Sequence, residues 1–167
     1  MYLKRYNSKQ KQIYFKAYSN VYQLETALNR IKVEDISYFQ ISILGKVSQY
    51  YMDTVNCFSE NIGPVKAYWK SIYGKGLKFG SFFNPELGNI FIVGSLVSTF
   101  LHKVDGKSLA TLSSGSYGIF RGMGVDEYET TECLKTLRNG KYLLIIRGFE
   151  ENLWQIEHVL ENQKTKS

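Results

Sequence analysis

The stretch 118–148, GIFRGMGVDEYETTECLKTLRNGKYLLIIRG, predicts a helix followed closely by a strand. Asp126 stands three residues before Glu129, and this capping pair predicts a helix start at Asp126, because carboxylates accept the unpaired N–H groups of a first turn. Gly140 predicts the end of the helix, since glycine tolerates the positive φ that follows a last turn. Tyr142–Ile146 is then a run of five apolar residues. Such a run is typical of a strand covered on both faces. We expect it inside the sheet between two neighbours, with helices on one face.

A strand, a helix and a second strand are predicted at the front of the chain. Gln12–Tyr18 has the composition of a strand, and Ile36–Leu44 predicts a second strand that pairs with it. Between them, apolar residues recur at i, i+3, i+4 and i+7 after the candidate caps Ser19 and Asn20. These apolar positions are Leu24, Ala27, Leu28 and Ile31.

The middle of the chain reads as two inserts around a third strand. Residues 46–88 have a polar and aromatic pattern that predicts one surface helix and a second helix near Pro64. Asn89–Leu101 predicts the third strand, and residues 105–122 form a small-residue insert with a helix candidate over Ser108–Phe120. Beyond the opening stretch, the spacing of Phe149, Leu153, Ile156 and Leu160 predicts a closing helix.

Without the inserts, the order of elements is βαββαβ. The predicted fold class is therefore α+β, a ferredoxin-like βαββαβ core with helical inserts and an extra C-terminal helix. A chain of 167 residues, 44% of them hydrophobic, fits one domain with a proper core. We expect this domain to span 11–162, between a flexible basic tail at 1–10 and a flexible tail at 163–167.

The net charge of +6 belongs mainly to the two ends of the chain. Without the six basic residues at the ends, the body of the chain has 15 basic and 15 acidic residues. The six are Lys4, Arg5, Lys9, Lys11, Lys164 and Lys166. Nucleic-acid binding is therefore expected to be weak and tail-mediated.

Contact with a membrane surface through Trp69 and its basic neighbours stays open, but the longest apolar window, Ile90–Leu101, is too short to span a bilayer. The polar amino terminus has no apolar signal segment, so we expect a cytoplasmic protein.

Three blocks resemble the bacterial heat-induced or general stress proteins with a YflT-type domain. GMGVDEYETTECLKTLRNGKYLLII is similar to the ending of that family, and NPELGNIFIVGSLVSTF to its central segment. The helix through Leu24, Ala27 and Leu28, leading into Glu34-Asp35-Ile36-Ser37, is similar to its opening. The resemblance implies a ferredoxin-like core with a glycine-rich helical insert and an association with stress, and it implies no catalytic residues.

No catalytic constellation is apparent in the sequence. Asp105-Gly106-Lys107-Ser108 imitates the tail of a phosphate-binding loop, but Leu101 stands where the first glycine is required, so a simple turn is favoured. His102 and His158 lack sequence-near partners, and Cys57 and Cys133 form no metal or redox motif. The acids Glu127, Glu129 and Glu132 are explained by a helix start. We therefore expect no enzyme activity, no cofactor and no metal.

Two sets of residues are candidates for binding. A ligand site is predicted where glycines let the backbone approach a ligand: Gly118, Arg121, Gly122 and Gly124. An interaction surface is predicted on the aromatic insert: Tyr68, Trp69, Tyr73, Phe82 and Phe83. The leading hypothesis is a non-enzymatic, stress-associated domain that acts through self-association, as a homodimer, or through a protein partner. The alternative is a small-ligand or anion-binding regulatory module.

Overall fold

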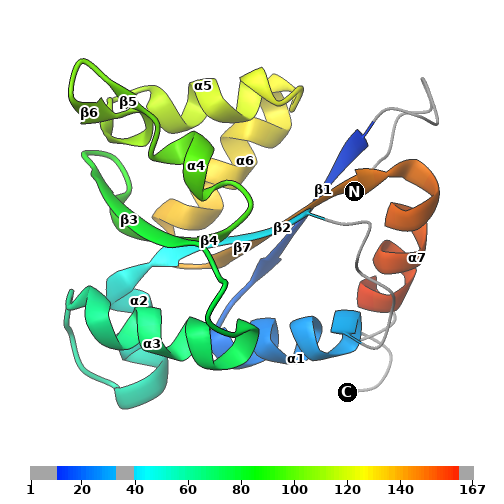
Figure 1. The fold of residues 1–167 in the computed structure, drawn as a ribbon, viewed down its shortest axis with the longest axis horizontal. Helices are drawn as coiled ribbons and strands as arrows, with labels where there is room; N and C mark the ends of the chain where they lie inside the picture. The colour runs from blue at the N-terminus through cyan, green and yellow to red at the C-terminus, as the bar shows by residue number, and fades with distance from the viewer. Residues whose placement is uncertain (1–10, 33–39, 162–167) are drawn as a thin grey trace.

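Five strands form one antiparallel sheet in the order β1-β7-β2-β4-β3 in the computed structural model, which describes residues 11–32 and 40–161 (Figure 1). The strands are β1 (Lys11–Tyr18), β2 (Gln40–Lys46), β3 (Phe79–Asn84), β4 (Gly88–Gly94) and β7 (Tyr142–Phe149). The helices are α1 (Val21–Lys32), α2 (Val47–Val55), α3 (Ile62–Tyr73), α4 (Val97–Phe100), α5 (Gly115–Gly122), α6 (Glu127–Arg138) and α7 (Glu150–Glu161). A small ribbon of β5 (Lys103–Val104) and β6 (Lys107–Ser108) leads into a 3-10 turn, η2 (Leu109–Thr111). The fold is therefore mixed α+β, as expected.

Strand β7 is central, which confirms its predicted place inside the sheet. It pairs with β1 along one edge, where Tyr14 faces Ile146, and with β2 along the other, where Ile43 faces Leu144. The predicted pairing of the first two strands is therefore wrong, because β7 lies between them. Both run antiparallel to β7, so β1 and β2 are parallel to each other without being neighbours. This strand order does not confirm the ferredoxin-like topology.

Helices cover both faces of the sheet, so the expectation of helices on one face is wrong. Successive side chains of a strand point to opposite faces, and Tyr142, Leu144 and Ile146 join the core formed with α1, α2, α3 and α7. Leu143 and Ile145 join a second core under α4, α5 and α6, and Figure 1 shows the two helical layers on either side of the sheet. The unbroken apolar run of β7 is the physical reason, since every residue in it needs a covered face.

The predicted helix boundaries around the opening stretch are confirmed. Asp126 is the N-cap of α6, and its side chain accepts a 2.8 Å hydrogen bond from the Glu129 amide. Gly140 follows the helix with a φ of +82°. At the front of the chain, the Asn20 side chain accepts a 2.9 Å bond from the Gln23 amide and so starts α1. Both helices begin where a side chain satisfies a first-turn N–H group.

Elsewhere the elements differ from the predicted ones. The strand predicted over Asn89–Leu101 ends at Gly94, whose φ of +100° turns the chain out of the sheet, and α4 occupies its second half. The helix predicted over Ser108–Phe120 begins only at Gly115, because η2 and a turn come first. The insert 46–88 contains α2 and α3 as predicted, and also β3, which was not predicted. The tails predicted at 1–10 and 163–167, and the beginning of the strand predicted over Ile36–Leu44, lie outside the described residues.

Candidate functional site

The aromatic residues of the insert pack mainly into the core. Trp69 is fully buried, with its ring 5.0 Å from that of Tyr68 and 6.4 Å from that of Tyr73, centroid to centroid. Phe82 is also buried and stacks on Phe100, whereas Phe83 is 56% exposed. The structure therefore places two of the five interaction candidates inside the protein. Trp69, with Tyr68 and Tyr73 against it, packs in the core on one face of the sheet, and Phe82 packs in the core on the other face.

The glycine candidates lie along α5 and in the turn after it. A side chain added at Gly118 or Gly122 would meet open space, and Gly124 has a φ of +93° that serves the turn into α6. Arg121 is exposed and donates a 3.4 Å hydrogen bond to the Tyr117 hydroxyl one turn earlier on the same helix. Tyr117 lines a pocket at the opposite, N-terminal end of α5. Through Tyr117, Arg121 is connected to this pocket.

This α5 pocket lies between the start of α5, helix α6 and the β3–β4 turn, and its volume is about 220 Å³. Its lining residues are mostly polar: Asn84, Glu86, Leu87, Ser113, Ser114, Ser116, Tyr117 and Leu134. Ser116 is 3% exposed, and its hydroxyl oxygen has no hydrogen-bond partner in the described part of the chain. A buried hydroxyl without a partner is uncommon, since most buried polar atoms are hydrogen-bonded.

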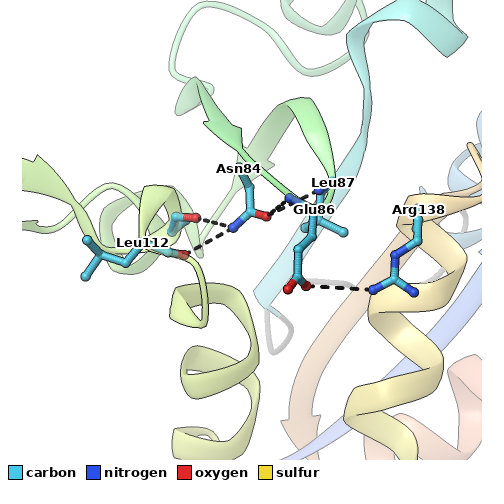
Figure 2. A network of polar contacts seen from close by, with 6 residues as sticks. Asn84, Glu86, Leu87, Leu112 and Arg138 are labelled. Carbon is cyan, nitrogen blue, oxygen red and sulfur yellow. Dashed lines mark hydrogen bonds and ion pairs between the residues drawn. The ribbon is translucent and has the colours of Figure 1, made fainter.

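Asn84 fixes the geometry of the α5 pocket (Figure 2). Its amide nitrogen donates to the carbonyl oxygens of Ala110 at 3.0 Å and Leu112 at 3.2 Å, in the segment before α5. Its amide oxygen accepts from the backbone N–H groups of Glu86 at 2.9 Å and Leu87 at 3.2 Å. One buried side chain therefore holds the β3–β4 turn against the chain that leads into α5. Its signal in the sequence is the Asn84-Pro85 dipeptide, which by itself is typical of a turn.

A second hollow, which we call the α6 groove, lies between α6 and the edge strand β1 and has a volume of about 380 Å³. Its lining residues come from β1, α6 with its N-cap, and β7: Phe15, Lys16, Ala17, Asp126, Tyr128, Glu129, Glu132, Cys133, Thr136 and Leu143. Residues at i, i+3, i+4 and i+7 share one side of a helix, and this spacing places Glu129, Glu132, Cys133 and Thr136 along the groove.

The α6 groove is acidic along its rim and apolar at its base. Asp126, Glu129 and Glu132 supply three carboxylates, and Tyr128 is 74% exposed beside them. Burial, together with the nearby Glu129 and Glu132, raises the pKa of the Cys133 thiol to about 12. With this raised pKa, Cys133 stays protonated at neutral pH and is an apolar wall of the groove. It is not a nucleophile there, because the thiolate is the nucleophilic form of cysteine.

Strand β1 forms one edge of the sheet and pairs only with β7 among the residues that the structure describes. Its side chains alternate, so that Phe15 contacts the core under α6 and Lys16 points to the opposite layer. There the Lys16 ammonium lies 2.9 Å from a carboxylate oxygen of Glu161 in α7. The lysine that lines the groove is therefore already paired with an acid outside it.

The remaining titratable candidates stay apart. Cys57 follows α2 on one side of the sheet and Cys133 lies in α6 on the other, and both thiols are free. His102 is exposed after α4 and His158 is exposed on α7. In the described ranges, no three His, Cys, Asp or Glu residues are grouped to hold a metal ion, and no helix has the length and apolarity needed to cross a membrane. Comparisons of the chain with protein-family models, with curated proteins and with solved structures find no match.

Proposed function

We propose that the protein is a non-catalytic interaction domain that binds a basic, extended segment of a partner chain along β1 and the α6 groove. The observation that carries the proposal is the position of three groove carboxylates beside a strand edge that has no partner in the described structure. An open strand edge offers backbone N–H and C=O groups to an added strand. Side chains of that strand would reach the groove at every second residue.

The side chains that line the α6 groove indicate which kind of partner segment would bind there. Asp126, Glu129 and Glu132 favour lysine or arginine side chains, while the apolar base at Phe15 and Leu143 suits the carbon stems of those side chains or an aromatic ring. Tyr128, 74% exposed at the rim, is of the residue type that most often anchors an interface. A basic segment with interspersed apolar or aromatic residues matches all three features.

The amino terminus of this chain has that composition. MYLKRYNSKQK contains Lys4, Arg5, Lys9 and Lys11 together with Tyr2 and Tyr6. A second copy of the protein is therefore the partner we propose, with a homodimer as the product, because two-fold assembly lets each copy give and receive the same segment. The family resemblance adds the proposal that this association serves a stress response in the cytoplasm.

Light scattering tests the association. We expect the full chain at micromolar concentration to be dimeric, and removal of residues 1–10 or the charge reversal Glu132→Lys to give monomers. Glu127→Lys is the matched control, because Glu127 is an exposed residue in the first turn of α6 that does not line the groove. A monomeric full chain would contradict the dimer.

A peptide experiment separates self-association from binding of another protein. A labelled peptide of residues 1–11 is titrated with the chain that lacks residues 1–10, and fluorescence anisotropy reports binding. We expect saturable binding that Glu132→Lys and Tyr128→Ala weaken and that Glu127→Lys preserves. If Glu132→Lys leaves the affinity unchanged, the groove is not the binding site and the proposal fails.

A further inference from the structure

The N-terminal end of α5 presents donor groups to the α5 pocket. Helix α5 spans Gly115–Gly122, and its N-cap residue Ser114 makes no side-chain capping bond. The first N–H groups of a helix have no partner within it, and they carry the positive end of the helix dipole. Ser113 and Ser114 add two exposed hydroxyls at the same end. The Gly115 amide already donates a 2.9 Å hydrogen bond to the Leu112 carbonyl oxygen. The donors that this end of α5 can present to the pocket are therefore the amides of Ser116 and Tyr117 and the serine hydroxyls.

Ser116 supplies an independent sign of a missing ligand. It lines the α5 pocket and is only 3% exposed, yet its hydroxyl oxygen has no hydrogen-bond partner among the described residues. Leaving such a group unpaired costs free energy, which a bound acceptor in the pocket would remove. A phosphate or carboxylate oxygen is an acceptor of the required kind, and helix N-termini bind such anions.

The pocket is built rigidly enough to hold a small ligand. A side chain at Gly115 would place its Cβ 1.9 Å from the Leu109 carbonyl oxygen, so glycine is required for α5 to begin against η2. The four hydrogen bonds of Asn84 fix the opposite wall (Figure 2). The donors at the start of α5 are thus held in place without the ligand.

The negative charge of Glu86 at the pocket is offset by the positive charge of Arg138 on α6. Glu86 lines the pocket, and its carboxylate lies 3.8 Å from the Arg138 guanidinium of α6. Figure 2 shows the two side chains reaching toward one another. Their pairing offsets the negative charge of Glu86, and it leaves a carboxylate acceptor available for a hydroxyl group on the ligand.

We propose that the α5 pocket binds a phosphate group, either as the free ion or as a small phosphate monoester. The phosphate oxygens accept hydrogen bonds from the Ser116 hydroxyl and from the Ser116 and Tyr117 amides in the first turn of α5. A volume of about 220 Å³ accommodates phosphate with a short hydroxylated chain. This site is separate from the α6 groove and does not depend on the proposed association.

Nuclear magnetic resonance of the full-length, ¹⁵N-labelled protein tests the site. Inorganic phosphate is added at constant ionic strength, and we expect saturable shifts of the Ser116 and Tyr117 amide signals. The variant Ser116→Ala should bind phosphate about tenfold more weakly, because it loses a hydrogen bond to a charged group. Its urea midpoint should stay the same or rise, since the lost hydroxyl had no partner. Ser71→Ala, on the far side of the sheet in α3, is the matched control for phosphate binding. It is also the contrast for the urea midpoint, because the Ser71 hydroxyl donates a 2.6 Å hydrogen bond to the Tyr68 carbonyl oxygen.

A second variant keeps the test independent of Ser116. Ser114→Asp places a carboxylate at the N-cap, where it accepts the free N–H groups and repels an anion. We expect it to abolish the phosphate-induced shifts while the protein stays folded. Glycerol phosphate identifies the source: tighter binding than inorganic phosphate indicates a monoester, and equal binding indicates the free ion. Amide signals of Ser116 and Tyr117 that do not move, or that move equally in Ser114→Asp, would overturn the proposal.

Discussion

The Tyr142 hydroxyl donates a 2.7 Å hydrogen bond to Asp53 Oδ2, which joins the central strand β7 to helix α2. The same carboxylate oxygen accepts a 3.0 Å bond from the Val21 amide at the start of α1. The other carboxylate oxygen accepts a 2.8 Å bond from the Gln49 side chain. One aspartate therefore holds two helices and the middle of the sheet in a fixed arrangement, which makes Asp53 a structural residue of this layer.

Replacing Tyr142 with phenylalanine is expected to lower the free energy of unfolding by about 2 kcal/mol. The ring keeps its packing, but Asp53 loses a donor in a partly buried site, and hydrogen bonds to charged groups are worth about 1.5–3 kcal/mol. Urea unfolding measures the change. Tyr128→Phe is the control, because Tyr128 is 74% exposed and should change the stability by less than about 0.5 kcal/mol. Equal effects in the two variants would rule out the structural role of the Asp53 bond.

Asn84→Ala is expected to destabilise the protein by about 3 kcal/mol. The change removes four hydrogen bonds of a side chain that is 2% exposed, and it leaves the buried Ala110 carbonyl without that donor. Urea unfolding checks the value, with Asn29→Ala on the exposed face of α1 as the control. An Asn84→Ala protein as stable as the control would show that the turn and the α5 segment are held by other contacts.

Two glycines of α5 are expected to respond to alanine in opposite ways. At Gly115 the new Cβ would lie 1.9 Å from the Leu109 carbonyl oxygen, so the start of the helix must move and the protein loses stability. At Gly118 nothing lies within 4 Å of the new Cβ, so alanine should stabilise the helix by up to about 1 kcal/mol. Thermal unfolding measures both. A loss of stability in Gly118→Ala would instead indicate that Gly118 makes a close contact.

The local parts of the fold could be predicted because their causes are local. The capping bond of Asp126 to Glu129, the positive φ of Gly140 and the apolar run of β7 each depend on residues within a few positions. The insertion of β7 between β1 and β2 could not be predicted in this way, because the first strand ends more than 120 residues before β7 begins. Sequence spacing favoured neighbouring strands, and tertiary packing overrode it.

The candidate sites were missed for a similar reason. Asn84 and Ser116 are far apart in the sequence, and nothing local shows that they line one pocket. The acids of α6 were interpreted as a helix start, which is correct for Asp126, but their position beside β1 depends on the sheet order. Trp69 and Phe82 were assigned to a surface because the covering of both sheet faces was not foreseen.

The protein is expected to lose stability in alkaline solution above about pH 8, where the Cys133 thiol of the unfolded chain begins to ionise. Burial raises the pKa of Cys133 from its ordinary value near 9.0 to about 12. Burial likewise raises the pKa values of six tyrosines, namely Tyr14, Tyr18, Tyr50, Tyr68, Tyr73 and Tyr142. Nearby acids add to the effect at Tyr14, Tyr18, Tyr68 and Tyr142. Above their ordinary pKa values, the unfolded chain releases these protons while the folded chain retains them. Because the unfolded state then binds fewer protons, the free energy of unfolding falls as the pH rises.

Urea midpoints measured from about pH 8 to about pH 11 test this linkage, since an ordinary tyrosine titrates near pH 10. We expect a constant stability up to about pH 8, a shallow decline as the Cys133 thiol of the unfolded chain ionises, and a steeper decline above about pH 10 from the tyrosines. Cys133→Ala should delay the onset, and Tyr142→Phe should reduce the slope above pH 10, because each variant removes one group that titrates only in the unfolded state. Tyr128→Phe, which removes an exposed hydroxyl, should leave the slope unchanged. A midpoint that stays level through pH 11 would mean that these side chains reach solvent and ionise in the folded protein.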